Sequence, residues 1–155
     1  GMGGQPFRIY KFRSMRPDAE AYLRKDPALH RRYVRNGFKL PAEHDPRISR
    51  LGAFLRRSSL DELPQLLNVL KGEMSLVGPR PIVPEELVNY GDSAPVFLAV
   101  RPGLTGYWQI NGRSEIGYPE RVDYDLHYVT RWSLGLDAEI LLKTIPAVLR
   151  RDGAY

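Results

Sequence analysis

Residues 55–81 read LRRSSLDELPQLLNVLKGEMSLVGPRP, and the expected fold is best worked out from this stretch. The pattern of residues 59–71 is helical, and Gly72 supplies a residue that readily ends a helix. Beyond that helix, two prolines restrict the backbone on both sides of Arg80, so no regular element continues through them. The stretch therefore predicts one clear helix, followed by an irregular turn that carries an arginine.

The rest of the chain predicts further helices and little β-structure. Apolar and basic residues alternate at 7–13, which is typical of a half-buried strand. Residues 103–112 set Leu, Tyr, Trp and Ile between glycines and predict a strand or hairpin, whereas 38–50 reads as a loop. Helices are expected over four further regions: 17–36, from Asp18 to a stop at Gly37 with a division near Pro27; 48–57; 84–100, with a turn at 90–93; and 118–151, interrupted at 133–135 and closed by Gly153. The fold class is therefore α+β, a predominantly helical single domain with a small strand or hairpin element.

Composition excludes several classes of protein. A chain of 155 residues has the size of one ordinary domain, and 43% hydrophobic residues are enough for a buried core, which excludes global disorder. The absence of cysteine excludes disulfides, thiolate zinc sites and cysteine nucleophiles. His30, His44 and His127 are too far apart in sequence to suggest a histidine metal cluster. No run of 18 or more apolar residues could span a bilayer by itself.

The charge balance points to anionic partners. The chain carries a formal net charge of +5, which suits nucleotide phosphates, a negatively charged membrane surface or nucleic acid. The basic residues are scattered, and no known nucleic-acid motif occurs, so nucleic acid is not expected as a partner. A non-catalytic basic module that holds a membrane surface or nucleic acid stays open as the alternative to an enzyme.

The densest polar cluster lies where the clear helix begins, and it has two interpretations. In the structural one, Ser59 and Glu62 form a capping box, with Asp61 and Glu62 favoured by the helix dipole. In the functional one, the helix N-terminus and the guanidinium groups of Arg56 and Arg57 bind phosphate. Those positive charges keep Asp61 ionised, so that it can act as a nucleophile or, with Glu62, hold a divalent cation such as Mg²⁺.

Two further places could bind a substrate. Proline on both sides of Arg80 either forms a structural turn or locks the arginine so that it meets a phosphate at little entropic cost. Residues 102–113 either line a pocket for a base or sugar or form a buried hairpin anchored by Trp108. Residues 124–128 and Asp137 read as ordinary helix faces.

Taken together, five motifs resemble one known family. They are YKFRSMR at 10–16, DPRI at 45–48, the whole of 55–81, PGLTG at 102–106 and WQINGR at 108–113. In this order they resemble the bacterial sugar transferases, the monotopic phosphoglycosyl transferases that start capsule, exopolysaccharide and O-antigen assembly. The resemblance implies transfer of a sugar 1-phosphate from a UDP-sugar to undecaprenyl phosphate, with release of UMP, at the cytoplasmic face of the bacterial inner membrane.

The resemblance also implies roles for individual residues. Asp61 would be the nucleophile that forms an aspartyl-phosphosugar intermediate, and Glu62, with Asp61, would hold Mg²⁺. Lys11, Arg56 and Arg80 match basic positions expected near substrate phosphates, with Arg57 as a further neighbour. Arg113 and Asp125 are weaker matches, for a nucleotide or sugar pocket.

The sequence departs from the family at its start. Family members carry an apolar N-terminal segment that enters the membrane as a re-entrant helix, and this sequence begins just after the corresponding position. We therefore expect residues 1–155 to be a catalytic domain without that segment, with residues 51–60 and 95–100 as candidate contacts with the inner leaflet. The identity of the sugar and any homo-oligomer stay open, although residues 150–155 resemble the ends of exopolysaccharide-type members and favour a hexose.

Overall fold

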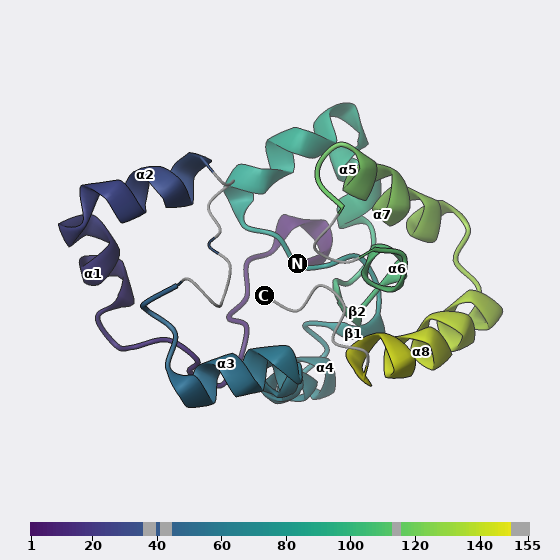
Figure 1. The fold of residues 1–155 in the computed structure, drawn as a ribbon. Helices are drawn as coiled ribbons and strands as arrows, with labels where there is room; N and C mark the ends of the chain where they lie inside the picture. Colours follow the sequence, from purple (N-terminus) through teal and green to yellow (C-terminus); the bar gives the residue numbers. More distant parts are fainter. Residues whose placement is uncertain (36–39, 41–44, 113–115, 150–155) are drawn as a thin grey trace.

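The computed structural model describes residues 1–35, 40, 45–112 and 116–149 (Figure 1). Helices dominate this part of the chain, and two short strands form a parallel pair, which confirms the α+β, mostly helical prediction. The elements are η1 Met2–Gly4, α1 Ala19–Lys25, α2 Pro27–Arg35, α3 Arg50–Arg57, η3 Leu60–Gln65, α4 Leu66–Leu70, β1 Ser75–Val77, η4 Pro84–Ser93, α5 Ala94–Leu98, β2 Gly103–Thr105, α6 Tyr107–Ile110, α7 Glu120–Thr130 and α8 Leu134–Leu149, where η denotes a 3₁₀-helix.

The first helical region is divided as expected. α1 and α2 form an arm on one side of the molecule, opposite α7 and α8 (Figure 1). Pro27 begins α2, and the Asp26 carboxylate caps it by accepting hydrogen bonds from the backbone N–H groups of residues 28 and 29, both at 3.0 Å. Leu23, Leu29 and Leu40 form the small apolar cluster of this arm. The stop expected at Gly37 lies outside the described residues.

The strand predicted over residues 7–13 is wrong. Within the described part of the chain no strand pairs with this segment, and the buried side chain of Asn68 takes that role. Asn68 Oδ1 accepts from Tyr10 N–H at 3.1 Å, and its Nδ2 donates to the Arg8 carbonyl at 2.7 Å. Phe12 N–H donates to the Asp61 carbonyl at 3.0 Å. The N-terminal segment is thereby fixed across η3 and α4.

The central region contains α3, η3 and α4. Ser49 caps α3 by accepting from Gly52 N–H at 2.9 Å, and this helix fulfils the prediction for residues 48–57. The clear helix expected from Ser59 starts as the 3₁₀-helix η3 and becomes α-helical only at Leu66. Pro64 lacks the N–H that an α-helical turn would need, which explains the tighter first half. Gly72, with φ of 76°, follows α4 as expected.

Of the strand or hairpin predicted at 103–112, the strand is confirmed as β2, but the hairpin is wrong, because β2 pairs in parallel with β1 and residues 107–110 are helical. Just after β1, the backbone of Gly78 lies directly against the backbone of Gly103 at the start of β2. A Cβ on Gly103 would lie 2.1 Å from the backbone nitrogen of Gly78, so only a glycine fits this place. Gly103 N–H donates to the Pro79 carbonyl at 2.7 Å, which fixes the backbone just before Arg80.

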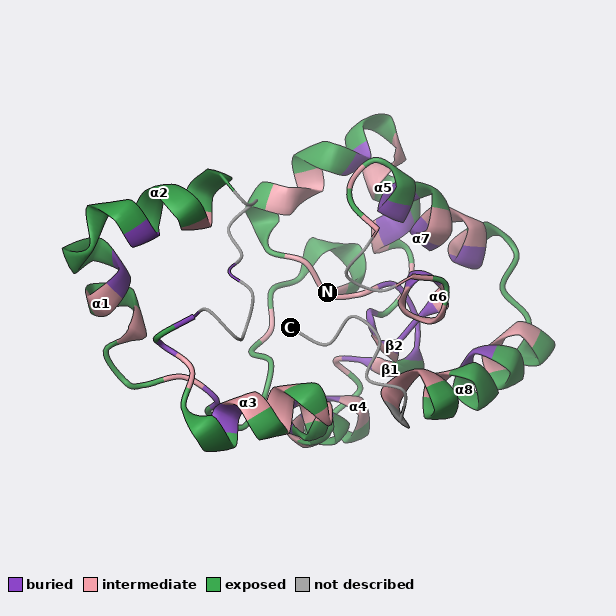
Figure 2. Cartoon of the chain, in the orientation of Figure 1, coloured by how far each residue is buried: buried purple, intermediate pink, exposed green. Residues whose placement is uncertain are grey.

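The remaining helices agree with the prediction, and α8 packs against both strands; the end expected at Gly153 lies outside the described residues. η4 and α5 occupy residues 84–98 with a kink at Gly91, and α7 and α8 are separated at residues 131–133. Two apolar clusters lie here: Val77, Tyr128 and Ile140 in one, and Tyr90, Phe97 and Val122 in the other. Figure 2 shows buried residues gathered around β1, β2 and α7. Within the described ranges, no helix is both long enough and apolar enough to cross a bilayer.

Candidate active site

A cavity of about 910 Å³ brings together residues that are far apart in the sequence. Its described wall includes five of the predicted site residues: Lys11, Arg56, Asp61, Glu62 and Arg80. The volume lies in the range of cavities that bind small molecules and cofactors. Asp61 and Glu62 therefore share a cavity wall with Lys11, Arg56 and Arg80, the three basic side chains that the resemblance places near substrate phosphates.

Asp61 is the most buried member of the pair. The residue is 9% exposed on η3, and burial raises the pKa of its carboxyl above the ordinary value. The positive charges of Lys11 and Arg56 act against that rise, whereas neighbouring Glu62 adds to it. The cations thus offset part of the cost of holding a charged carboxylate in this place.

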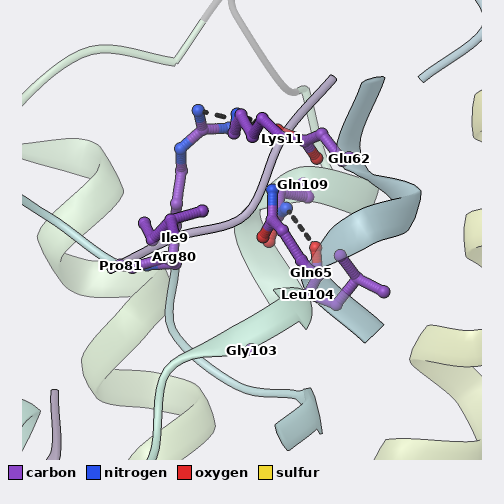
Figure 3. A pocket seen from close by; sticks show the side chains of 9 residues that line it. All are labelled: Ile9, Lys11, Glu62, Gln65, Arg80, Pro81, Gly103, Leu104 and Gln109. Carbon is purple, nitrogen blue, oxygen red and sulfur yellow. Dashed lines mark hydrogen bonds and ion pairs between the residues drawn. The ribbon is translucent and has the colours of Figure 1, made fainter. Parts of the chain in front are cut away.

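Glu62 lies between two cations. Its Oε1 accepts a hydrogen bond from Lys11 Nζ at 2.7 Å, and Nη2 of Arg80 is 4.0 Å from the same oxygen. Figure 3 shows Lys11 and Arg80 on the same side of the small pocket beside this carboxylate. Glu62 thus brings together a lysine of the N-terminal segment and the arginine of the proline-flanked turn.

Arg56 is positioned by a serine of the N-terminal segment. Its Nε donates to Ser14 Oγ at 2.8 Å, and burial lowers the pKa of the guanidinium, while the Asp61 charge opposes this. The contact depends on Gly52 in α3, because a Cβ there would lie 1.8 Å from the Ser14 carbonyl oxygen. α3 can therefore approach close enough for Arg56 to reach the cavity.

The capping interpretation of Ser59 is wrong. Ser59 precedes η3, but it makes no capping hydrogen bond through its side chain, and its φ of 56° places it in the left-handed region. The Ser58 hydroxyl instead donates to the carbonyls of Phe54 and Leu55 at the end of α3. The turn between α3 and η3 is thus not built as a capping box, and Glu62 points to Lys11 instead.

The acidic pair can hold a magnesium ion only with help from a substrate. Among the described residues no group of three or more His, Cys, Asp or Glu side chains could ligate a metal. Two adjacent carboxylates that share a cavity with cations nevertheless fit the way Mg²⁺ is commonly bound, by one or two carboxylates plus substrate phosphates. The residues present therefore fit the ion if a phosphorylated ligand completes its coordination.

A second polar group lies on another part of the wall, around α7. Arg121 is 7% exposed and lines the cavity with Trp108 and Gln109. Asp125, one turn later, is 1% exposed and accepts from the Tyr90 hydroxyl at 2.7 Å. Burial raises the pKa of Asp125 to about 6, although the Tyr90 hydrogen bond and the Arg121 charge act in the opposite direction.

Comparison with known proteins identifies the family of this chain. The profile described as "Bacterial sugar transferase" matches residues 1–151. This chain belongs to the bacterial sugar transferase family. It is 50% identical, over its whole length, to an "Undecaprenyl-phosphate galactose phosphotransferase" of Salmonella typhimurium, of which the match covers 33%.

Other relatives of this sugar transferase family member carry related names. It is 48% identical to "Exopolysaccharide production protein ExoY" of Sinorhizobium fredii, of which the match covers 69%. It is 42% identical to a "UDP-glucose:undecaprenyl-phosphate glucose-1-phosphate transferase" of Xanthomonas campestris, of which 31% is covered. The chain thus spans about a third of the length of several relatives.

Not every predicted site residue of this sugar transferase domain lies at the cavity. Arg57 is exposed on α3 and is not among the described lining residues, so its role stays a prediction. Arg113 lies outside the described residues. Asp125 is enclosed beneath the wall and does not itself line the cavity. Sequence reasoning missed Arg121 and Ser14; an arginine four residues before an aspartate in a helix reads as an ordinary surface pair.

Proposed function

We propose that this protein is a phosphoglycosyl transferase. It moves a sugar 1-phosphate from a UDP-sugar to undecaprenyl phosphate through an aspartyl-phosphosugar intermediate, the first membrane step of exopolysaccharide or O-antigen synthesis. The observation that carries the proposal is the buried Asp61 carboxylate facing a cavity whose wall also holds Lys11, Arg56 and Arg80. The names of its relatives support the same substrate classes.

In the first half of the reaction, an Asp61 carboxylate oxygen attacks the β-phosphorus of the UDP-sugar. A bond forms between that oxygen and phosphorus, and the bond from the β-phosphorus to the bridging oxygen breaks. The electron pair leaves with UMP. Phosphoryl transfer depends mainly on positioning and on neutralising the charge of the phosphate oxygens, which Lys11, Arg56 and Arg80 supply from three separate segments.

In the second half, a phosphate oxygen of undecaprenyl phosphate attacks the same phosphorus. The bond between phosphorus and the Asp61 oxygen breaks, its electron pair returns to the Asp61 carboxylate, and a polyprenyl diphosphate sugar leaves. The covalent intermediate divides the transfer into two steps, so one cavity can serve both substrates in turn. Glu62 and Asp61 would hold Mg²⁺, which would supply additional neutralisation of the diphosphate.

We further propose that the protein works at the cytoplasmic face of the bacterial inner membrane. On α3, Leu51 and Phe54 are 67% and 50% exposed, next to the exposed Arg50 and Arg57. Apolar side chains among arginines suit the headgroup region of an anionic membrane. The second candidate contact, residues 95–100, is partly committed to the core, because Phe97 is 6% exposed.

The deciding experiment measures UMP release by the protein at its full natural length in detergent or nanodiscs. UDP-glucose, UDP-galactose and N-acetylated UDP-sugars are offered with undecaprenyl phosphate and Mg²⁺. We expect UMP that disappears with EDTA and with Asp61→Asn. Asp92→Asn, an exposed aspartate outside the described cavity wall, is the matched control and should keep wild-type release.

Two results would contradict the proposal. Wild-type turnover by Asp61→Asn would exclude Asp61 as the nucleophile. If no UDP-sugar released UMP, and binding to DNA or anionic vesicles fell steeply with salt, the protein would be the non-catalytic basic module instead.

A further inference from the structure

Arg121 on α7 is a buried arginine whose hydrogen-bonding groups are not all used. It is 7% exposed at the cavity wall, and among the described residues neither Nε nor Nη2 has a hydrogen-bond partner. The Asp125 Oδ2 atom lies 3.8 Å from Nε, too far for a hydrogen bond. Buried donors of a charged group are costly when unsatisfied, so this arrangement indicates a ligand that supplies acceptors.

Aromatic rings hold the guanidinium without using its N–H groups. The Arg121 Cζ atom lies 4.8 Å from the centroid of the Trp108 ring and 5.1 Å from that of the Tyr118 ring. Such contacts engage the face of a guanidinium and fix its plane without using its N–H groups. The side chain is thus preorganised for a ligand.

The neighbours of Arg121 suggest which part of a ligand would bind. Trp108 Nε1 is a buried donor and Gln109 Oε1 a buried acceptor, both without a partner and both from residues that line the cavity. The Asp125 carboxylate compensates the Arg121 charge. A phosphate is better matched by the three basic side chains around Asp61 and Glu62, whereas neutral oxygens with an accompanying donor fit the group of Arg121, Trp108 and Gln109.

We propose that Arg121, together with Trp108 and Gln109, binds the uncharged part of the nucleotide-sugar donor, through carbonyl or hydroxyl oxygens of its base or its sugar. This inference rests on the proposed function, because it takes a UDP-sugar as the occupant of the cavity. Arg121 then determines affinity and orientation of the donor, separately from the residues that contact its phosphates.

The test measures binding rather than turnover, in full-length protein that carries Asp61→Asn. Affinities for UDP-glucose, UDP-galactose and UMP are measured by calorimetry with and without Arg121→Met. We expect at least about a 10-fold loss of affinity, since hydrogen bonds to charged groups are worth that much or more. A loss for both UMP and the UDP-sugars assigns the contact to the nucleoside, and a loss for the UDP-sugars alone assigns it to the hexose.

Arg47→Met is the matched control. Arg47 is equally buried at 7%, lines the same cavity and lies over the Tyr33 ring, but its guanidinium is bound by both Asp45 oxygens at 2.8 Å. Its loss should lower the melting temperature more than the loss of Arg121, while donor affinity in the folded fraction stays near that of the parent.

Arg121→Lys covers the case in which Arg121→Met does not fold. Lysine keeps the charge and the stem but loses the planar fork, so a several-fold loss of affinity supports the inference. Unchanged affinity in either folded variant overturns it and leaves Arg121 a structural residue whose donors bind buried water. If the Asp61→Asn parent bound no UDP-sugar and the wild type released no UMP, the proposed function would fail, and this inference with it.

Discussion

Lys11 Nζ lies 2.7 Å from Glu62 Oε1, so a residue of the N-terminal extended segment pairs directly with the acidic pair of η3. The backbone of the next residue is held as well, because Phe12 N–H donates to the Asp61 carbonyl at 3.0 Å. These contacts join positions about fifty residues apart and make the first dozen residues part of the site. The electrostatics of Asp61 therefore depend on a segment that has no regular structure.

Replacing Lys11 should change the pH dependence of the reaction. Burial raises the pKa of Asp61, and Lys11 is the strongest of the charges that lower it. In Lys11→Met that pKa rises, so the acidic limb of the pH–rate profile for UMP release moves to higher pH. Lys71→Met is the control: Lys71 bonds the Tyr10 hydroxyl on the same segment but lies outside the described cavity wall. Equal profiles for the two variants would contradict the assigned role of Lys11.

The two adjacent arginines of α3 should differ strongly. Arg56 lines the cavity and is held by Ser14, whereas Arg57 is exposed and outside the described wall. We expect Arg56→Met to reduce kcat/KM for the UDP-sugar about 10- to 100-fold, the usual worth of a charge-assisted hydrogen bond. Arg57→Met should change it less than about 3-fold. The reverse order would show that α3 presents its other face to the donor.

Asp61→Asn should not cost stability at neutral pH. Because burial raises the pKa of Asp61 above its unfolded value, ionisation of this residue opposes folding once the pH exceeds about 4. The asparagine variant lacks that cost. Its melting temperature should equal that of the wild type at pH 4 and exceed it at pH 7. A lower melting temperature at pH 7 would mean that the cations stabilise the carboxylate more than burial penalises it.

Ionisation of Asp125, whose pKa is about 6, should also make the free energy of unfolding depend on pH. Between the unfolded value of 3.8 and this folded value, stability falls as the pH rises, because the folded state gives up the proton less readily. Asp125→Asn keeps an acceptor for the Tyr90 hydroxyl and should gain, relative to the wild type, up to about 3 kcal/mol above pH 6. Denaturant unfolding at pH 4, 5, 6 and 7 measures this difference, and a constant difference across the series would contradict it.

Asn68 should matter for activity although it is not at the dyad. It is fully buried, and its amide bonds the backbone of Arg8 and Tyr10 and the Glu73 carboxylate. Asn68→Ala should lower the free energy of unfolding by about 2–4 kcal/mol and raise the KM for the UDP-sugar, because the segment that carries Lys11 is released. Asn89→Ala, which removes an exposed amide bound to the Glu86 carbonyl, is the control and should change neither value.

The sequence predicted what depends on local patterns. The division at Pro27, the helix over 50–57 and the two C-terminal helices follow from periodicity, prolines and caps, and the structure agrees. Predictions failed where the partner is distant in sequence. The alternation at 7–13 could not reveal that Asn68 replaces a neighbouring strand, and the short apolar run at 103–105 could not reveal a parallel partner at 75–77.

The candidate site shows the same division. Its acidic pair and three of its cations were found because they fall within quoted motifs, and the fold does bring them to one cavity. The prediction of a capping box failed because Ser59 adopts a left-handed conformation, which the neighbouring residues in the sequence do not indicate. Arg121 was missed because its significance lies in unused hydrogen-bonding capacity and aromatic neighbours, which only packing reveals.

The close backbone contact between Gly78 and Gly103 limits where the protein can be redesigned. Backbone touches backbone there, and the same junction anchors the turn that leads into Arg80. A library of variants at this cavity should leave the junction as it is, since any added side chain would displace Arg80 along with the turn. Val83 lines the same cavity and is 54% exposed, so diversity can be introduced there without disturbing this junction or the core.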